Sequence, residues 1–294
     1  MTYMSPAVTV AIPFTKFDQY LDRAIRSVFA QSLDDWALLL FGDGASDEDV
    51  LRATQIADAR VSVHRSKSRR GLAATLNQVA HLAETEYLVR MDADDIMRPM
   101  RLHNQMTRLT AQDPPDLVCS HSYAIDQESQ VLGLLKERPI PSDPKGFLES
   151  NCIAHPTVSG KTEWFLRNPY NTDYARAQDK ELWLRTAGQT AIEKLDSVDI
   201  YYRIDTTISG TKRRVSGLYN RQLLRDYGPV YSTRSDTALR ILRVYGGELM
   251  SKLPLITREK GASADRRVVP LSDSEEGTLQ SELKSIVSIP VPGL

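Results

Sequence analysis

Cysteine is scarce in this 294-residue chain, which contains only Cys119 and Cys152. Two cysteines cannot form a disulfide-rich scaffold, and their spacing is neither that of a metal site nor that of a redox-active pair. We therefore expect both residues to be buried thiols in a protein of a reducing compartment.

The chain also lacks long apolar runs and a clear excess of either charge. No stretch approaches the roughly 20 apolar residues of a membrane-spanning helix. The first residues, "MTYMSPAVTV", do not show a basic region followed by an apolar one. The formal net charge of -1 gives no electrostatic reason to bind nucleic acid. These absences predict a cytoplasmic protein without a nucleic-acid partner.

What the chain does contain, up to about residue 110, is a regular alternation of strand-like and helix-like segments. Strands are expected at 7–13, 36–41, 60–64 and 86–91, and helices at 20–31, 46–57, 71–83 and 99–110. The continuous apolar run "WALLLF" is typical of a parallel strand that is covered on both faces. The alternation predicts an α/β protein with a Rossmann-like, mostly parallel central sheet and helices on both faces. Such sheets bind ligands at the carboxyl ends of their strands.

The pattern becomes less regular after residue 113. We expect a hairpin at 116–135, a helix at 179–187, a strand at 197–204 and two amphipathic helices within 216–249. These C-terminal helices carry Arg221, Arg225, Arg240 and Arg243 beside apolar residues. They are either packed helices with a solvated basic face or helices that lie on a membrane surface. From about residue 257 the chain turns polar, and we expect a tail that is either an appendage or partly disordered.

Three carboxylates, Asp92, Asp94 and Asp95, directly follow the strand expected at 86–91. Like charges this close repel one another, and a divalent cation would relieve the repulsion. Carboxylates are hard oxygen ligands that suit Mg²⁺ or Mn²⁺. The alternative interpretation is a solvated acidic turn. Because α/β sheets bind ligands at strand ends, a metal site is as well supported as that alternative.

Three other segments each allow a functional and a structural interpretation. Asp43 lies between two glycines after a strand, where it could accept the imide N–H of uracil or thymine, or simply form an Asp-Gly turn. The basic segment 65–70 ends in Arg70 beside a helix start, which suits a diphosphate or a solvated loop. Asp179 begins a helix and is a candidate general base or a helix cap.

The chain resembles the inverting, Asp-x-Asp type of family 2 glycosyltransferases, which have the GT-A fold. The resemblance rests on five segments in the family's order, namely "VTVAIPFTKFDQYLDRAIRSVFAQSLDDWALLLFGDGASD", "GLAATLNQVAHLAETEYLVRMDADDIMRP", "NCIAHPTV", "AQDKELWLR" and "YYRIDTTISG". It implies a GT-A domain over 1–215, with a nucleotide-sugar half of about 1–113 and an acceptor half of about 114–215. A helical extension over 216–256 and the polar tail over 257–294 would follow.

The resemblance also implies roles for individual residues. Those that would hold the nucleotide are Pro13, Asp43, Arg70 and Asp92. The metal, Mn²⁺ or Mg²⁺, would be held by Asp94, with Asp95 and Asp205 as further candidates. Asp179 would be the catalytic base, and the acceptor side of the cleft would include His155 and Trp183.

Three positions depart from the family's pattern. Gly42 stands where many relatives have an acid, so recognition of the base would rest on Asp43 alone. Gln178 also stands where an acid is common. Asp205 replaces a histidine that contacts the metal or diphosphate in relatives. It is therefore either a replacement metal ligand or a sign that the site closes differently.

The resulting hypothesis is metal-dependent, inverting transfer of a sugar from a nucleotide-diphosphate sugar to a hydroxyl group. UDP is the expected donor nucleotide, with dTDP second, and the acceptor is a glycan, a lipid-linked molecule or a small molecule. One alternative is a nucleotidyltransferase, although "AIPFTKFDQ" lacks the glycine-rich phosphate loop of that class. The other is a non-catalytic sugar-nucleotide-binding protein. The sequence leaves open the donor sugar, the acceptor, the oligomeric state and a peripheral contact with the inner face of the membrane.

Overall fold

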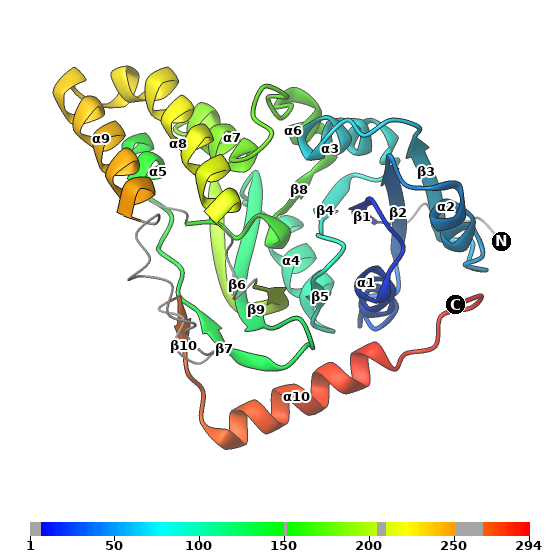
Figure 1. The fold of residues 1–294 in the computed structure, drawn as a ribbon. Coiled ribbons are helices and arrows are strands. Elements are labelled where there is room, and N and C mark those ends of the chain that lie inside the picture. The colour runs from blue at the N-terminus through cyan, green and yellow to red at the C-terminus, as the bar shows by residue number, and fades with distance from the viewer. Residues whose placement is uncertain (1–6, 150–151, 205–209, 251–266) are drawn as a thin grey trace.

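The computed structural model describes residues 7–149, 152–204, 210–250 and 267–294. A central sheet runs through the molecule, with helices on both of its faces (Figure 1). The strands are β1 Val8–Phe14, β2 Trp36–Asp43, β3 Val61–Ser66, β4 Tyr87–Arg90, β5 Ile96–Met97, β6 Leu117–Ile125, β7 Val131–Leu135, β8 Ser159–Lys161, β9 Ile192–Arg203 and β10 Val268–Val269. The helices are α1 Gln19–Phe29, α2 Asp47–Thr54, α3 Leu72–Leu82, α4 Arg101–Leu109, α5 Pro144–Glu149, α6 Thr162–Arg167, α7 Gln178–Thr186, α8 Gly210–Tyr231, α9 Arg234–Met250 and α10 Asp273–Val287, with a short 3₁₀ helix at His155–Thr157.

The N-terminal half of the sheet is parallel, as the alternation of segments predicts. Its strands follow the order β4-β1-β2-β3, and each neighbouring pair is parallel. Because parallel strands end at the same edge, the segments that follow β1, β2 and β4 are brought together there. The expected α/β fold with a mostly parallel sheet is confirmed for this half.

Both faces of this sheet are buried, and consecutive residues of one strand enter different cores. Val10 and Ile12 of β1 pack with α1, whereas Ala11 between them packs with α3. Side chains alternate across a strand, so a strand that is covered on both faces must be apolar at consecutive positions. This explains the uninterrupted apolar run of β2.

The second half extends the sheet in a mixed pattern. The hairpin of β6 and β7 is antiparallel, as expected, and β9 lies parallel to β6 on its other side. The two helices expected within 216–249 are also confirmed, as α8 and α9. They pack closely because Gly228 has no side chain; a Cβ there would come within 2.6 Å of Thr237 Cγ2.

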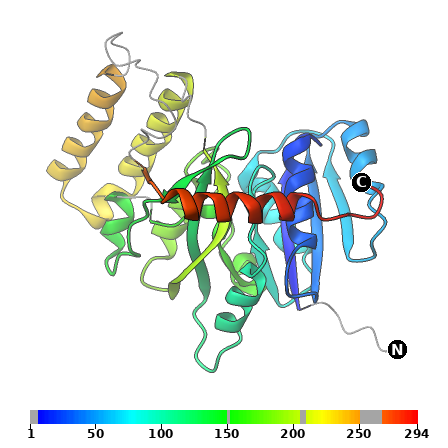
Figure 2. The same cartoon turned by 90° about the horizontal axis from the view of Figure 1, so that it is seen from below.

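Of the polar tail over 257–294, the structure describes residues 267–294, and this part has regular secondary structure. It forms β10, which pairs with β7, and α10, which lies along β7 and α1 (Figure 2). The helix begins at a capping box in which Ser272 and Glu275 bond each other's backbone N–H groups. Its apolar residues are few, but Leu279, Leu283 and Ile286 lie on one face and are buried, and Val287 packs partly buried against the same cluster. The polar composition of this segment therefore did not indicate the narrow apolar face on which α10 packs.

Cys119 and Cys152 are both buried and free, as predicted. Among the described residues, no helix combines the length and apolar character that are needed to cross a membrane.

Shortening a buried side chain of α10 should measurably destabilise the whole fold. Leu283 is 2% exposed and packs in one cluster with Ile96, Ile125 and Tyr201. Leu283→Ala should lower the free energy of unfolding by about 2–5 kcal/mol, because it leaves a cavity. Urea titration monitored by circular dichroism measures the change. Leu51→Ala is the matched control, since Leu51 is 62% exposed, and it should change stability by less than about 0.5 kcal/mol. Equal effects of the two substitutions would contradict the packing of α10.

Candidate active site

A cavity of about 360 Å³ opens at the carboxyl ends of the parallel strands. Pro13 lines it from the end of β1, Asp43 from the end of β2, and Asp92 and Asp94 from the loop that follows β4. These residues are far apart in the sequence, but the common direction of the strands brings them to one edge. Pro13, Asp43, Asp92 and Asp94 therefore line one cavity.

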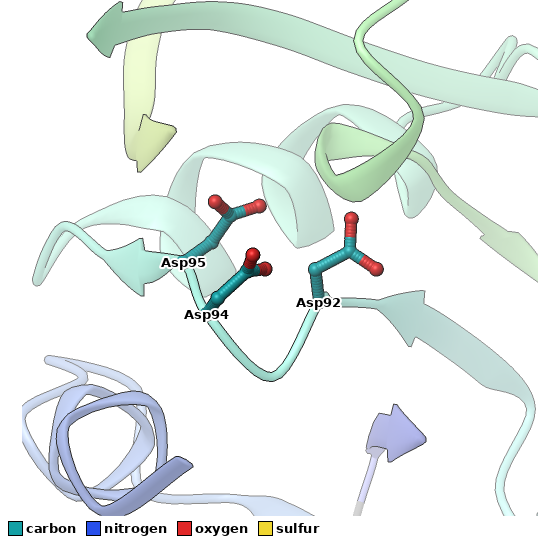
Figure 3. A group of neighbouring side chains, drawn as sticks. All are labelled: Asp92, Asp94 and Asp95. Carbon is teal, nitrogen blue, oxygen red and sulfur yellow. The ribbon is translucent and has the colours of Figure 1, made fainter. Parts of the chain in front are cut away.

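The three acidic residues form a compact cluster in the loop between β4 and β5. Figure 3 shows Asp92, Asp94 and Asp95 extending from this loop with their carboxylates close together. One oxygen of each can be chosen so that all three lie within 4.8 Å of one another. Asp95 is buried, Asp92 is partly buried, and Asp94 is the most exposed. The donor set and its spacing fit a divalent cation such as Mg²⁺ or Mn²⁺.

The cluster is electrostatically strained without a cation. Loss of solvation raises the pKa of Asp94, and the charge of Asp92 raises it further. Burial likewise raises the pKa of Asp95, to which the charges of Asp92 and Asp94 add. Asp95 Oδ2 has no hydrogen-bond partner among the described residues. A proton or a bound cation would stabilise this group, since both reduce the net negative charge.

Arg203, at the end of β9, holds the acidic loop in place. Its backbone N–H donates to Asp95 Oδ1 over 2.8 Å, and its Nε donates to the Asp94 carbonyl over 2.9 Å. Its guanidinium also lies over the ring of Tyr20, 4.5 Å from the centroid. One arginine thus connects the loop to β9 and to the start of α1.

Arg90, the last residue of β4, contacts the acidic cluster through Asp92. It is 3% exposed, and its Nη2 donates to Asp92 Oδ1. Its Nε and Nη1 have no partner among the described residues. Its charge lowers the pKa of Asp179, which burial raises. Arg90 is therefore close to Asp92 and also to Asp179, which comes from a different part of the chain.

Asp43 has a structural role that the sequence did not indicate. Its two carboxylate oxygens accept the backbone N–H groups of Arg70 and Gly71, over 2.6 and 2.9 Å. Asp43 thereby fixes the basic segment against the start of α3, where Gly71 has a φ of 89°. The Arg70 guanidinium itself bonds Gln78 over 2.7 Å, and the neighbouring Arg69 is the one that lines the cavity.

Asp179 lies in the first turn of α7, outside the residues that line the cavity. The residue at the helix N-cap, Ala177, has a φ of 61°. A non-glycine residue in this left-handed region is strained, and such strain is often found at functional sites. Burial raises the pKa of Asp179, and Arg90 and Lys180 partly oppose that shift.

His155 and Trp183 lie side by side but are largely inaccessible. Their ring centroids are 6.1 Å apart, and the side chains are 7% and 3% exposed. His155 Nε2 is 2.9 Å from the hydroxyl of Tyr170. Burial and the charge of Arg90 depress the pKa of His155, which keeps the ring neutral. Neither residue lines the cavity, and their burial limits direct contact with an acceptor.

Sequence reasoning missed several residues at this site, and one expected residue is not described. Asp205 lies outside the described residues. The missed residues that line the cavity include Lys16, Tyr20 and Thr75, whereas Arg69 belongs to the basic segment 65–70 that the sequence indicated. Thr75 is fully buried, and its hydroxyl has no partner among the described residues. Arg90 had a visible signal, since it is a charged residue within the apolar run "YLVRM". The partners of Arg203 are too distant in the sequence to be recognised there.

Comparison with known sequences gives matches over most of this region. The profile of glycosyl transferase family 2 matches residues 9–182. An uncharacterized glycosyltransferase of Methanocaldococcus jannaschii is 25% identical over 219 residues, which are 71% of this chain and 76% of that protein. The O-antigen biosynthesis glycosyltransferase WbnJ of Escherichia coli is 24% identical over 203 residues, which are 67% of this chain and 79% of that protein.

Solved structures agree at the level of the fold. The mannosyltransferase PcManGT of Pyrobaculum calidifontis, in complex with GDP-Man and Mn²⁺, has a TM-score of 0.59 and 14% identity, and the match covers 97% of this chain and 86% of that one. S. aureus TarS in complex with UDP has a TM-score of 0.54 and 14% identity, with 75% and 70% covered. This likeness shows the GT-A architecture. Since the family profile spans more than half of the chain, the chain belongs to glycosyl transferase family 2 and is a glycosyltransferase.

Proposed function

We propose that this enzyme transfers a sugar, with inversion and with the help of a divalent metal, from a nucleotide-diphosphate sugar to an acceptor hydroxyl. The observation that carries the proposal is that Asp43, at the end of one strand, lines the same cavity as Asp92 and Asp94 after another. A nucleotide bound at Asp43 and its diphosphate bound at the acidic cluster would then both lie within this cavity. The acceptor remains a glycan, a lipid-linked molecule or a small molecule.

The acidic cluster would hold Mn²⁺ or Mg²⁺ through Asp94, with Asp92 near the ribose and Asp95 in a supporting position. When bound, such an ion supplies positive charge that stabilises the diphosphate as it leaves. The raised pKa values of Asp94 and Asp95 support this proposal, because they indicate a site that favours added positive charge. Arg203 would keep the loop in its binding geometry, since it bonds both Asp94 and Asp95.

The donor nucleotide would lie between Pro13 and Asp43, with its phosphates toward the cations of the cavity. Lys16 and Arg69 line that cavity, so they replace Arg70 as the nearer candidates for phosphate contacts. We keep UDP as the first candidate, which the UDP complex of TarS supports. GDP is the next candidate, because the similar Pyrobaculum enzyme is in complex with GDP-Man.

Asp179 would act as the general base. In a single displacement, its carboxylate takes the proton of the acceptor hydroxyl as that oxygen attacks the anomeric carbon from the face opposite the leaving group. The bond to the nucleotide diphosphate breaks, and the configuration inverts. Arg90 would position this chemistry, since it bonds Asp92 and its charge keeps Asp179 more ionised than burial alone would.

Removing the proposed metal ligand should abolish metal-dependent donor binding. Asp94→Ala should weaken UDP binding in the presence of Mn²⁺ by more than the roughly 10–100-fold that loss of an outer-shell partner costs. Isothermal calorimetry with and without Mn²⁺ measures this. Asp113→Ala is the control, because Asp113 is an exposed acid in the segment that joins α4 to β6. UDP binding that is tight in Asp94→Ala, or that never responds to Mn²⁺, would refute the metal role.

Neutralising the proposed base should separate catalysis from binding. Asp179→Asn should lower kcat by about 10²–10⁴-fold, because proton transfer by one positioned carboxylate contributes about that much. UDP affinity should stay within about threefold of the wild type, as expected for a base that does not contact the nucleotide. The control is Asp173→Asn, an exposed acid just before the same helix. Release of nucleoside diphosphate during sugar transfer gives the rate, and an unchanged kcat would remove Asp179 from the mechanism.

The pH dependence of kcat tests the electrostatics of the base. Asp179 must be deprotonated to act, and burial raises its pKa above the ordinary 3.8. Activity should therefore fall, as pH decreases, at a higher pH than an ordinary aspartate would give. Arg90→Met should move this acidic limb to still higher pH, because it removes a charge that lowers the pKa. Arg90→Lys keeps the charge and should move it less. A limb that is the same in all three proteins would exclude the role of Arg90.

A further inference from the structure

Exposed apolar side chains gather on the hairpin formed by α8 and α9. Nine large apolar residues are exposed in the described part of the chain, and five of them are on this hairpin. They are Leu218 at 50%, Val230 at 68%, Leu239 at 46%, Leu242 at 65% and Tyr245 at 45%. In Figures 1 and 2 the hairpin stands at one end of the molecule, opposite α2 and β3. Such a concentration of apolar surface indicates an interaction site.

The same segment is strongly basic, although the protein as a whole is not. Residues 210–250 contain eight Lys and Arg against three Asp and Glu, which is a net charge of +5 in a chain whose total is -1. The remaining residues are therefore net acidic. This separation of charge would turn the hairpin toward an anionic surface and the rest of the protein away from it.

Three arginines of the hairpin are available for such a surface. Arg225, Arg234 and Arg243 are exposed, and no acidic side chain of the described residues pairs with them. Arg240, by contrast, is bonded to Asp236 and Glu149. Arg225 follows Leu218 by seven residues, and Arg243 follows Leu239 by four. At these spacings, cation and leucine share one side of their helix.

Residues of α8 on the inner side of the hairpin anchor it to α7. Tyr227 of α8 donates a hydrogen bond to Glu181 of α7, and Tyr231 donates to the Leu184 carbonyl over 3.2 Å. Leu223 and Leu224 are buried in the same core as Trp183. These contacts hold the exposed leucines and arginines of the hairpin in a defined orientation to α7, which carries Asp179.

We propose that the outer face of the α8–α9 hairpin docks on an anionic lipid bilayer surface. The exposed leucines would enter the boundary between headgroups and acyl chains, and Arg225, Arg234 and Arg243 would meet the lipid phosphates. A second copy of the chain is the competing occupant, but it would bring two segments of charge +5 together, which electrostatic repulsion opposes. The bilayer supplies both the apolar layer and the negative charge that this face lacks.

Vesicle flotation of the full-length protein tests the proposal without donor or acceptor, so its outcome does not depend on the proposed reaction. The vesicles are phosphatidylcholine alone or phosphatidylcholine with phosphatidylglycerol. The protein should float with the phosphatidylglycerol vesicles and remain largely unbound with phosphatidylcholine alone. Binding should weaken in 0.5 M NaCl, because salt screens the charge interaction.

Matched substitutions test whether vesicle binding depends on the hairpin or on any exposed leucine or arginine. Leu239→Ser/Leu242→Ser should reduce the partition coefficient at least about tenfold, since two apolar side chains no longer leave water. Leu51→Ser, at a leucine that is 62% exposed on α2, should not change it. Arg225→Glu/Arg243→Glu should also reduce binding at least about tenfold, whereas Arg167→Glu, at an exposed arginine of α6, should not. Circular dichroism and UDP calorimetry verify that each variant is folded.

Equal loss of binding in the control and hairpin variants, or no flotation with phosphatidylglycerol vesicles, would overturn the proposal. A second copy as the occupant would instead give dimers in sedimentation equilibrium that dissociate in Leu239→Ser/Leu242→Ser. That result, together with absent vesicle binding, would reassign the face to self-association.

Discussion

Mutual repulsion among Asp92, Asp94 and Asp95 is the constraint on which the site depends. Three carboxylates within 4.8 Å are unstable as anions unless positive charge is supplied nearby. Arg90 supplies it through its bond to Asp92, and Arg203 supplies it while bonding Asp94 and Asp95. These two arginines hold the loop, yet the pKa of Asp95 remains well above its ordinary value. The charge balance is therefore incomplete in the protein alone.

The same electrostatic arrangement connects the two halves of the protein. Arg90 ends β4, in the half that carries the proposed nucleotide site, and its charge acts on Asp179 at the start of α7. Trp183 of α7 packs in one core with Leu223 and Leu224 of α8. Tyr227 of α8 also donates a hydrogen bond to Glu181 of α7. The position of the proposed base is thus determined by packing in the second half and by charge from the first.

The C-terminal segment shows how composition can misrepresent structure. Residues 267–294 are polar on average, but α10 buries Leu279, Leu283 and Ile286. The Glu282 carboxylate also accepts hydrogen bonds from Arg98 over 2.6 Å and from Tyr201 over 2.8 Å. Beyond the helix, the Pro292 carbonyl accepts the backbone N–H of Ala57 over 2.8 Å. The segment therefore bridges from β7 past α1 to the region of α2. The short apolar stripe is thus supplemented by polar contacts at Glu282 and at Pro292.

The sequence by itself determined the parallel sheet, the order of its elements and the acidic cluster. Those features depend on local patterns: apolar runs such as "WALLLF", helical spacing, and three aspartates within four positions. Tertiary structure alone decided that Asp43 bonds the backbone of Arg70 and Gly71, that Arg69 lines the cavity in place of Arg70, and that Arg203 holds the acidic loop. These contacts join residues 27 to 109 positions apart. No local pattern encodes them, because they exist only once the strand ends have been brought to one edge of the sheet.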